Sequence, residues 1–278
     1  YSNNSYVKSL WYKGILNLIF LPGLFLSVLN TQMFVAPINK CHTAFRSILI
    51  YYKHIFNLVF PATCIHCRRE LLYEEPYVCW CCEAGFKHTG FENQKEPTSL
   101  DQLFWGRVPV YQTFALLYFE KGSSTQSILH ELKYGHKPQL GIIMGRKIAE
   151  VFFLNSRGQT IEVLIPVPTH HKKKFVRGYN QSEKIAQGIS KRTNIPIDNG
   201  FIFKRKQTES QTKKTKAERW SNVSGGFRQG AQNENKYKHI AIVDDVITTG
   251  ATLEALIKEI KQMHPMIEIS IFAVAMAK

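Results

Sequence analysis

The chain has 278 residues, of which 44% are hydrophobic, and this is ample for one full-sized domain with a small additional module. Neither an internal repeat nor a second enzymatic domain is visible. The net charge of +15 and the pI near 9.5 fit general surface solubility, or an anionic partner such as a phosphorylated substrate or a nucleic acid. Much of the excess falls in local clusters, namely Lys172–Lys174 with Arg177, Lys204–Lys206, and Lys213–Arg219.

Residues 1–44 form an apolar extension whose status the sequence leaves open. No charge occurs between Gly14 and Asn39, a pattern typical of a signal peptide or a membrane anchor. Pro22 and Gly23 interrupt it, no small-residue cleavage site is evident, and the first methionine is Met33. These facts favour translated sequence upstream of the true start, with an anchor as the alternative. We therefore expect a cytoplasmic protein and assign no membrane partner.

Residues 45–92 predict a leading helix followed by a small cysteine module. Cys64-x-x-Cys67 and Cys79-x-x-Cys82 can bring four thiolates around one tetrahedral Zn²⁺. The stretch between them is too short for a core of its own, so the metal would supply most of its folding energy, roughly 10–16 kcal/mol. Disulfides are the competing interpretation in a secreted protein. A closed four-sulfur site is structural, because it keeps no open position for catalysis.

Two amphipathic segments follow. Residues 123–134 carry Ile128, Leu129 and Leu132 on one face of a predicted helix, and Gly135 suits the position just past its end. Residues 140–154 predict a second helix that is dense in apolar side chains. Both segments are interpreted first as structural.

Residues 162–167 predict a buried strand that ends in Pro166-Val167-Pro168. Two prolines stop the strand ladder and fix a tight loop at its carboxyl end, where ligands bind in open α/β sheets. The segment from Lys172 to Arg177 supplies four cations beside this loop, and Asn180 suits a helix N-cap. The loop could grip a pyrophosphate, and an exposed basic turn is the alternative.

Residues 204–227 are polar and poor in apolar side chains. Long polar loops within a compact domain are uncommon unless they are lids or disordered. A basic lid, with Lys213 among its cations, would close over a diphosphate and exclude water. A flexible surface hairpin fits the composition equally well.

The stretch from His239 to Thr252 is the most informative part of the chain. Ile240–Val243 reads as a buried parallel strand, and Asp244 and Asp245 stand where that strand would end. A Thr/Gly turn, residues 248–252, then leads into a predicted helix, whose N-terminus suits a phosphate. Paired carboxylates would repel a phosphate unless they bind sugar hydroxyls or a divalent cation. The pattern therefore predicts phosphate, ribose and Mg²⁺ together; an ordinary capped strand–turn–helix is the alternative.

This stretch resembles the phosphoribosyl-pyrophosphate (PRPP) signature of type I phosphoribosyltransferases. The chain as a whole, from about Phe45 onward, resembles the ComF family of phosphoribosyltransferase-like proteins associated with competence for DNA uptake. The matching elements are the cysteine pairs, Leu132-Lys133-Tyr134, Pro166-Val167-Pro168, Arg177-Gly178-Tyr179-Asn180-Gln181, the Gln211…Arg219…Asn222…Phe227 loop and Val243–Gly250.

The resemblance implies an α/β fold over residues 105–278, with a type I phosphoribosyltransferase-like parallel sheet flanked by helices. It also implies a small N-terminal zinc-binding module built from four cysteines. Asp244 and Asp245 would hold the ribose hydroxyls and Mg²⁺, while Arg177 and Lys213 would meet the diphosphate. The remaining PRPP-binding positions would be Thr248, Thr249, Gly250, Ala251, Thr252, Pro166, Val167 and Pro168.

Two classes of function remain open at this stage. An enzyme would transfer a 5-phosphoribosyl group from PRPP to an acceptor that the sequence does not identify. A non-catalytic protein would sense PRPP or handle single-stranded nucleic acid as part of the competence machinery, since fold alone does not settle function. Salt-sensitive binding to a phosphate backbone would mark the second class.

Overall fold

The computed structural model describes residues 61–72, 74–153, 160–204, 226–230 and 237–277. The expected apolar extension, the leading helix before residue 61, and Lys213 lie outside these ranges. The described residues belong to one compact unit, Pro61–Lys278. The bounds expected for the separate domains stay a prediction.

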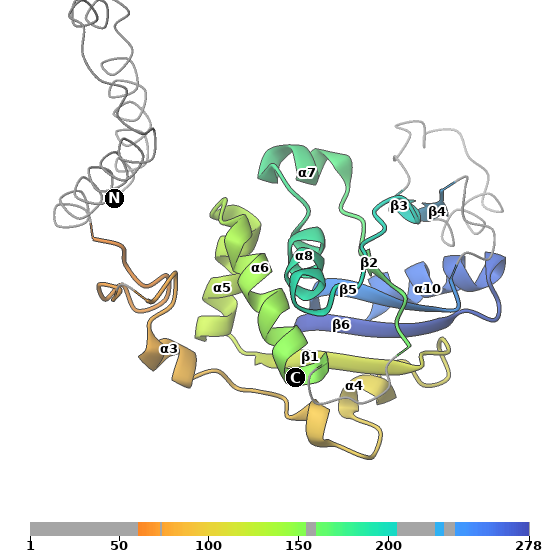
Figure 1. Cartoon of the computed structure of the whole chain (residues 1–278), viewed down its shortest axis with the longest axis horizontal. Coiled ribbons are helices and arrows are strands. Elements are labelled where there is room, and N and C mark those ends of the chain that lie inside the picture. The colour runs from red at the N-terminus through yellow and green to blue at the C-terminus, as the bar shows by residue number, and fades with distance from the viewer. Residues whose placement is uncertain (1–60, 73, 154–159, 205–225, 231–236, 278) are drawn as a thin grey trace, which may run out of the picture. The chain divides into compact units, whose positions relative to one another are not determined.

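The elements run in an alternating order over most of this unit (Figure 1). The helices are α3 (Trp80–Ala84), the 3-10 turn η1 (Phe91–Asn93), α4 (Ser99–Gln102), α5 (Ser124–Tyr134), α6 (Pro138–Ile148), the π-helical turn η2 (Ala149–Phe153), α7 (His171–Arg177), α8 (Gln181–Thr193) and α10 (Ala251–Met263). The strands are β1 (Gln112–Phe119), β2 (Val163–Pro166), β3 (Ile202–Lys204), β4 (Phe227–Gln229), β5 (His239–Ile247) and β6 (Glu268–Ala277).

The main sheet has four strands in the order β1-β6-β5-β2, and every neighbouring pair is parallel. β3 and β4 form a separate antiparallel hairpin. Parallel strands must be joined by crossovers, and here helices supply them, so both faces of the sheet are covered. The expected α/β class, a parallel sheet flanked by helices with a cysteine cluster at its N-terminal side, is confirmed.

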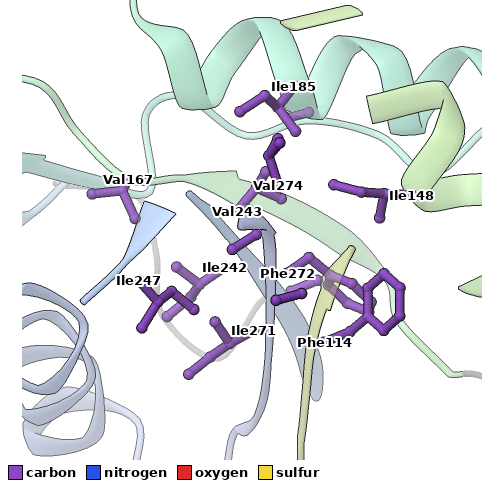
Figure 2. Packing of buried hydrophobic residues seen from close by; sticks show 14 of the residues in the cluster. Phe114, Ile148, Val167, Ile185, Ile242, Val243, Ile247, Ile271, Phe272 and Val274 are labelled. Atoms are coloured by element: carbon purple, nitrogen blue, oxygen red, sulfur yellow. The ribbon is translucent and has the colours of Figure 1, made fainter. Parts of the chain in front are cut away.

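The core follows from the alternation of side chains along the central strands. Val243 and Val274 point towards Ile185 of α8, whereas Ile242 and Ile271 lie on the opposite side of the sheet (Figure 2). All five side chains are buried. Strands that are apolar on both faces are typical of parallel sheets covered by helices on each side.

Helices α6 and α8 pack closely against each other. A Cβ atom placed on Gly145 would lie 2.0 Å from the carbonyl oxygen of Ile185, and one on Gly188 would lie 2.2 Å from that of Ile142. These distances are far below van der Waals contact, so only glycine fits at the crossing. The close packing holds α8 against α6, and the first turn of α8 carries Ser182 of the candidate site.

Three local predictions differ from the structure. β5 continues through both acids to Ile247, because β6 is long enough to pair with it as far as Met276. The basic segment after Pro168 is not all loop: His171–Arg177 forms α7, which ends at Gly178 with a φ of 79°. Helix α10 begins at Ala251, so the last two residues of the predicted phosphate turn lie in its first turn.

Among the described residues, no helix combines the length and apolar character needed to cross a membrane.

Candidate functional site

The two acids of β5 are held by helices from different parts of the chain. Oδ1 of Asp244 accepts a hydrogen bond from the Ser182 hydroxyl at 3.1 Å and one from the backbone N–H of Asp245 at 2.8 Å. Oδ2 of Asp245 lies 3.0 Å from the ammonium of Lys133, at the end of α5. Helices α5 and α8 therefore meet at the acidic pair.

Asp244 resists ionisation in this setting. Its removal from water and the negative charge of Asp245 together raise its pKa from 3.8 to about 7, although hydrogen bonds from Asp245 and Ser182 and the charge of Lys133 oppose the rise. A cation or a sugar hydroxyl at this point would favour the ionised form. The donor set, two adjacent carboxylates, suits a hard divalent cation.

The loop after β5 presents a helix N-terminus to solvent. Thr248 and Thr249 are exposed, and Gly250 adopts the left-handed conformation with a φ of 70°. A side chain at Gly250 would also crowd the Phe104 ring, 3.0 Å from the added Cβ. Gly250 itself offers no side-chain cap to α10, and the Ala251 N–H donates to the Thr249 hydroxyl at 3.4 Å. Helix N-terminal N–H groups without such a cap suit an anion.

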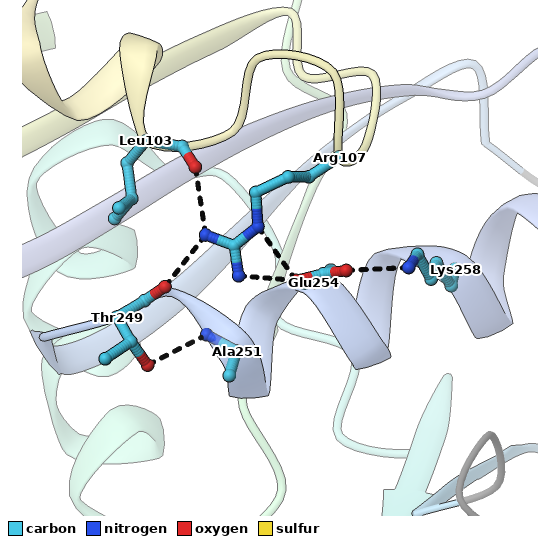
Figure 3. Close-up of polar contacts among 6 residues, drawn as sticks. All are labelled: Leu103, Arg107, Thr249, Ala251, Glu254 and Lys258. Carbon is cyan, nitrogen blue, oxygen red and sulfur yellow. Dashed lines mark hydrogen bonds and ion pairs between the residues drawn. The ribbon is translucent and has the colours of Figure 1, made fainter.

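Arg107 fastens this loop from a distant part of the chain (Figure 3). Its Nη1 donates to the carbonyl oxygens of Leu103 at 3.0 Å and Thr249 at 2.9 Å, and its Nε donates to Glu254 of α10 at 2.9 Å. One guanidinium thus ties the loop to both the preceding segment and the helix. Sequence reasoning missed Arg107, because no local pattern announces a contact across 147 positions.

The Pro166-Val167-Pro168 segment lies beside the acids because β2 and β5 are neighbours. The Val167 N–H donates to the carbonyl oxygen of Val243 at 2.9 Å. The Asn180 amide donates to the Val167 carbonyl at 3.0 Å, and its Oδ1 caps α8 by accepting from the Ser182 N–H at 3.2 Å. Asn180, the predicted N-cap, therefore also fixes the proline loop.

Arg177 is held next to the same region. Its Nη1 donates to Oε1 of Gln181 at 3.0 Å, and its guanidinium lies 5.4 Å from the centre of the Tyr134 ring. Gln181 precedes Ser182, which contacts the first acid, and Tyr134 follows Lys133, which pairs with the second. The Tyr179 hydroxyl donates to the Leu132 carbonyl at 2.6 Å and closes this network.

The structure brings together most of the predicted site residues at the carboxyl ends of β2 and β5: the acidic pair, the 248–252 segment, the proline loop and Arg177. Lys213 lies outside the described residues, so its predicted contact with the diphosphate stays a prediction. Lys133 belongs to an element of the family resemblance, but it was not predicted to contact the acidic pair. A charged side chain at the end of an apolar helix face was the available signal.

The four predicted metal ligands form one cluster. The Sγ atoms of Cys64, Cys67, Cys79 and Cys82 all lie within 4.8 Å of one another. Those of Cys67 and Cys79 are 3.6 Å apart, and a tetrahedral site with metal–sulfur bonds of about 2.3 Å would place its sulfurs roughly 3.8 Å apart. The cluster therefore fits a single metal ion such as zinc.

The thiols of the cluster are not equivalent. Burial opposes ionisation of Cys64, but hydrogen bonds from the backbone of Cys79, Cys67 and His66 outweigh it and lower its pKa to about 6. Burial and hydrogen bonds to the other thiols raise the pKa of Cys82. Cys81 lies outside the cluster, exposed, with Nη1 of Arg69 3.6 Å from its sulfur.

The cysteine module packs on the helix that carries Lys133. The Ser124 hydroxyl, in the first turn of α5, donates to the Cys82 carbonyl at 3.1 Å, and Ser127 lies within hydrogen-bond distance of His66 at 3.0 Å. Lys147 of α6 pairs with Glu83 of α3. The module therefore supports the element that reaches the acidic pair.

Comparison with known proteins gives a consistent set of relatives. Competence protein F of Haemophilus influenzae is 27% identical over 73% of this chain and 93% of its own length. Competence protein ComFC of Bacillus subtilis is 32% identical over 33% of this chain and 35% of its own. DNA utilization protein YhgH of Escherichia coli K12 is 24% identical over 45% of this chain and 56% of its own.

No family model matches the chain. Among solved structures, a glutamine PRPP amidotransferase from B. subtilis, complexed with ADP and GMP, aligns with a TM-score of 0.35 and 17% identity, over 52% of this chain and 30% of that one. The sequence relatives include competence proteins from two organisms, and the cysteine cluster and parallel sheet lie where the sequence motifs predicted them. These relatives support the resemblance to the ComF family that the sequence motifs carry.

Proposed function

We propose that the chain binds PRPP together with Mg²⁺ and is a phosphoribosyltransferase of the ComF type. The observation that carries the proposal is the convergence of three elements at one edge of the sheet. These are the acidic pair of β5, the N-terminus of α10, and the proline loop after β2. Ligands bind at the carboxyl ends of strands in open α/β sheets.

Each part of PRPP has a matching part of this edge. The 5′-phosphate would bind the N–H groups at the start of α10, where the helix dipole favours negative charge. Asp244 and Asp245 would accept hydrogen bonds from the ribose hydroxyls and hold Mg²⁺ through their carboxylates. The diphosphate would lie along the Pro166–Pro168 loop, with Arg177 and Lys213 as its cations.

In the transfer step, a bond forms between the acceptor and the anomeric carbon, and the bond from that carbon to the pyrophosphate oxygen breaks. Pyrophosphate leaves with the bonding electrons, and any proton released by the acceptor passes to solvent. Bound Mg²⁺ would neutralise charge on the diphosphate. The chain's own contribution is to orient the ribose and to present cations to the leaving group.

The cysteine cluster would hold a structural Zn²⁺, because four thiolates within 4.8 Å close the coordination sphere. We place the protein in the cytoplasm, where reducing conditions keep such thiols available for metal. The relatives named for competence and DNA utilization connect the proposed activity with DNA uptake.

A second candidate, a non-catalytic protein that senses PRPP or handles single-stranded nucleic acid, is favoured by α7. This helix buries none of its residues and carries Lys172, Lys173 and Lys174 beside the 89%-exposed Phe175. Consecutive cations followed by an exposed ring suit a single strand. Release of pyrophosphate from PRPP, screened with bases and amines, separates the enzyme from this alternative.

A further inference from the structure

A cavity of about 880 Å³ shares Pro166 and Pro168 with the proposed diphosphate position and extends from there to the β3–β4 hairpin. Residues of α7 and of the β3–β4 hairpin line it. Pro166 and Pro168 also line it, together with Asn180, the N-cap of α8, and Glu183 from the first turn of that helix. That turn also carries Ser182, which contacts Asp244. A ligand in the cavity would therefore lie next to the position proposed for the ribose.

The hairpin contributes an aromatic ring and a cation from adjacent strands. Phe203 and Arg228 are cross-strand partners, so their side chains share one face of the hairpin. The guanidinium of Arg228 lies 6.0 Å from the centre of the Phe203 ring. Phe203 keeps 41% of its surface exposed although it lines a cavity. An exposed ring of this kind offers a face for a planar ligand.

The base of the hairpin is anchored, which gives this surface a defined position. Ile202 and Phe227 are buried. The Gly230 N–H donates to the carbonyl oxygen of the buried Phe201 at 3.1 Å. Phe203 and Arg228 therefore extend from two strands whose other face is packed into the protein.

The lining carries an excess of positive charge. Its charged side chains are Lys174, Lys204 and Arg228 against the single carboxylate of Glu183, which already lies 3.7 Å from Lys174. Within the part of the chain that the structure describes, neither Lys204 nor Arg228 has a carboxylate at ion-pair distance. A cavity of this charge favours an anion.

We infer that this cavity binds a planar aromatic anion, its ring stacked on Phe203 and its charged group against Arg228. Resting on the proposed function, the inference makes such a compound the acceptor of the phosphoribosyl group. Two sources share this chemistry, a free aromatic carboxylic acid and a nucleotide. The volume falls within the range of small-molecule sites, roughly 300–1,000 Å³, and accommodates either.

The test uses two matched ligand pairs and the full zinc-loaded chain. Nicotinate and nicotinamide have the same ring and differ in charge, as do AMP and adenosine. Ligand-observed NMR titration without PRPP measures all four. We expect the charged member of at least one pair to bind about tenfold or more tightly than its uncharged partner. Tighter binding of nicotinate than of nicotinamide identifies the ligand as a free aromatic acid. Tighter binding of AMP than of adenosine identifies it as a nucleotide.

Variants tie that preference to the cavity. Arg228→Gln should abolish the preference for the charged member, and Phe203→Leu should weaken binding of both members about tenfold. Matched controls outside the cavity, Arg192→Gln and Tyr111→Leu, should change neither. Both altered positions are exposed, so folding is verified by thermal melting and zinc content.

Absence of binding by all four ligands would overturn the inference, as would binding that the cavity variants leave unchanged. A parallel titration with PRPP distinguishes failure of the proposed PRPP binding from failure of the proposed acceptor cavity. PRPP binding with no aromatic binding refutes the acceptor cavity alone. Aromatic binding without PRPP binding refutes the proposed function and leaves an independent anion site.

Discussion

The ammonium of Lys133 lies 3.0 Å from Oδ2 of Asp245, although the two residues are 112 positions apart in the chain. Both side chains are largely removed from solvent, with 25% and 12% of their surfaces exposed. The pair links the cysteine module, which packs on α5, with the acidic pair of β5. It also supplies a cation to a strand end that would otherwise carry two adjacent negative charges.

This pair should show an energetic coupling. In a double-mutant cycle with Lys133→Met and Asp245→Asn, we expect a coupling of about 1–3 kcal/mol in the free energy of unfolding, because removal of one partner strands a partly buried charge. Urea denaturation measures it. The same cycle on the more exposed pair of Glu131, in α5, and Lys137, at the start of α6, should give roughly 0.2–1 kcal/mol. Equal couplings in the two cycles would contradict the assignment.

The raised pKa of Asp244 predicts a pH dependence of stability. The folded protein holds this proton more tightly than the unfolded chain, so the contribution of Asp244 to the free energy of unfolding falls as the pH rises from about 4 to about 7. The Asp244→Asn variant has no ionisable group at this position, so its free energy of unfolding does not fall in this way. Its stability relative to the parent protein should therefore increase by more than about 1 kcal/mol between pH 5 and pH 8. Urea denaturation in Mg²⁺-free buffer tests this, and a pH-independent difference would refute it.

Much of the site could be predicted from the sequence because its parts are local. The buried strand, the two acids and the Thr/Gly turn are consecutive, and each cysteine pair spans four positions. Lys133 and Arg107 could not be placed in this way. Their partners lie more than a hundred positions away and depend on which strands are neighbours.

The strands at the two ends of the predicted polar lid were also not predicted from the sequence. Residues 204–227 are polar as a whole, so the composition favours a loop or a flexible hairpin. The structure pairs Lys204 with Phe227 at the base of the β3–β4 hairpin. A three-residue strand is too short to give a periodic signal, and this is why β3 and β4 were not predicted. The residues between them, Lys213 included, lie outside the described part.

Metal binding should depend on four of the cysteines and not on the fifth that lies beside them. Cys64→Ser should abolish stoichiometric zinc and lower the melting temperature, because the module has little core of its own. Cys81→Ser should retain about one zinc per chain, since Cys81 lies outside the cluster. Zinc quantification on both purified variants distinguishes them. Loss of zinc in Cys81→Ser with retention in Cys64→Ser would require a different ligand set.

Arg107 should act by positioning the phosphate loop. Arg107→Gln removes the bonds to Thr249 and Glu254, and we expect PRPP affinity to fall about tenfold because the loop is no longer fixed. Lys258→Gln is the matched control: it removes the other cation of Glu254, at 2.6 Å, and leaves the Thr249 carbonyl held. Calorimetry should show normal affinity in the control. Equal losses in both variants would mean that Glu254, and not the loop contact, is responsible.

The most direct test of the central claim is calorimetric titration of PRPP into the zinc-loaded chain, with and without Mg²⁺. The account predicts saturable, Mg²⁺-dependent binding that the double variant Asp244→Asn, Asp245→Asn abolishes while it keeps its fold and its zinc. Binding that is unchanged in this variant, or no binding by the folded parent protein, would contradict the assignment of the site.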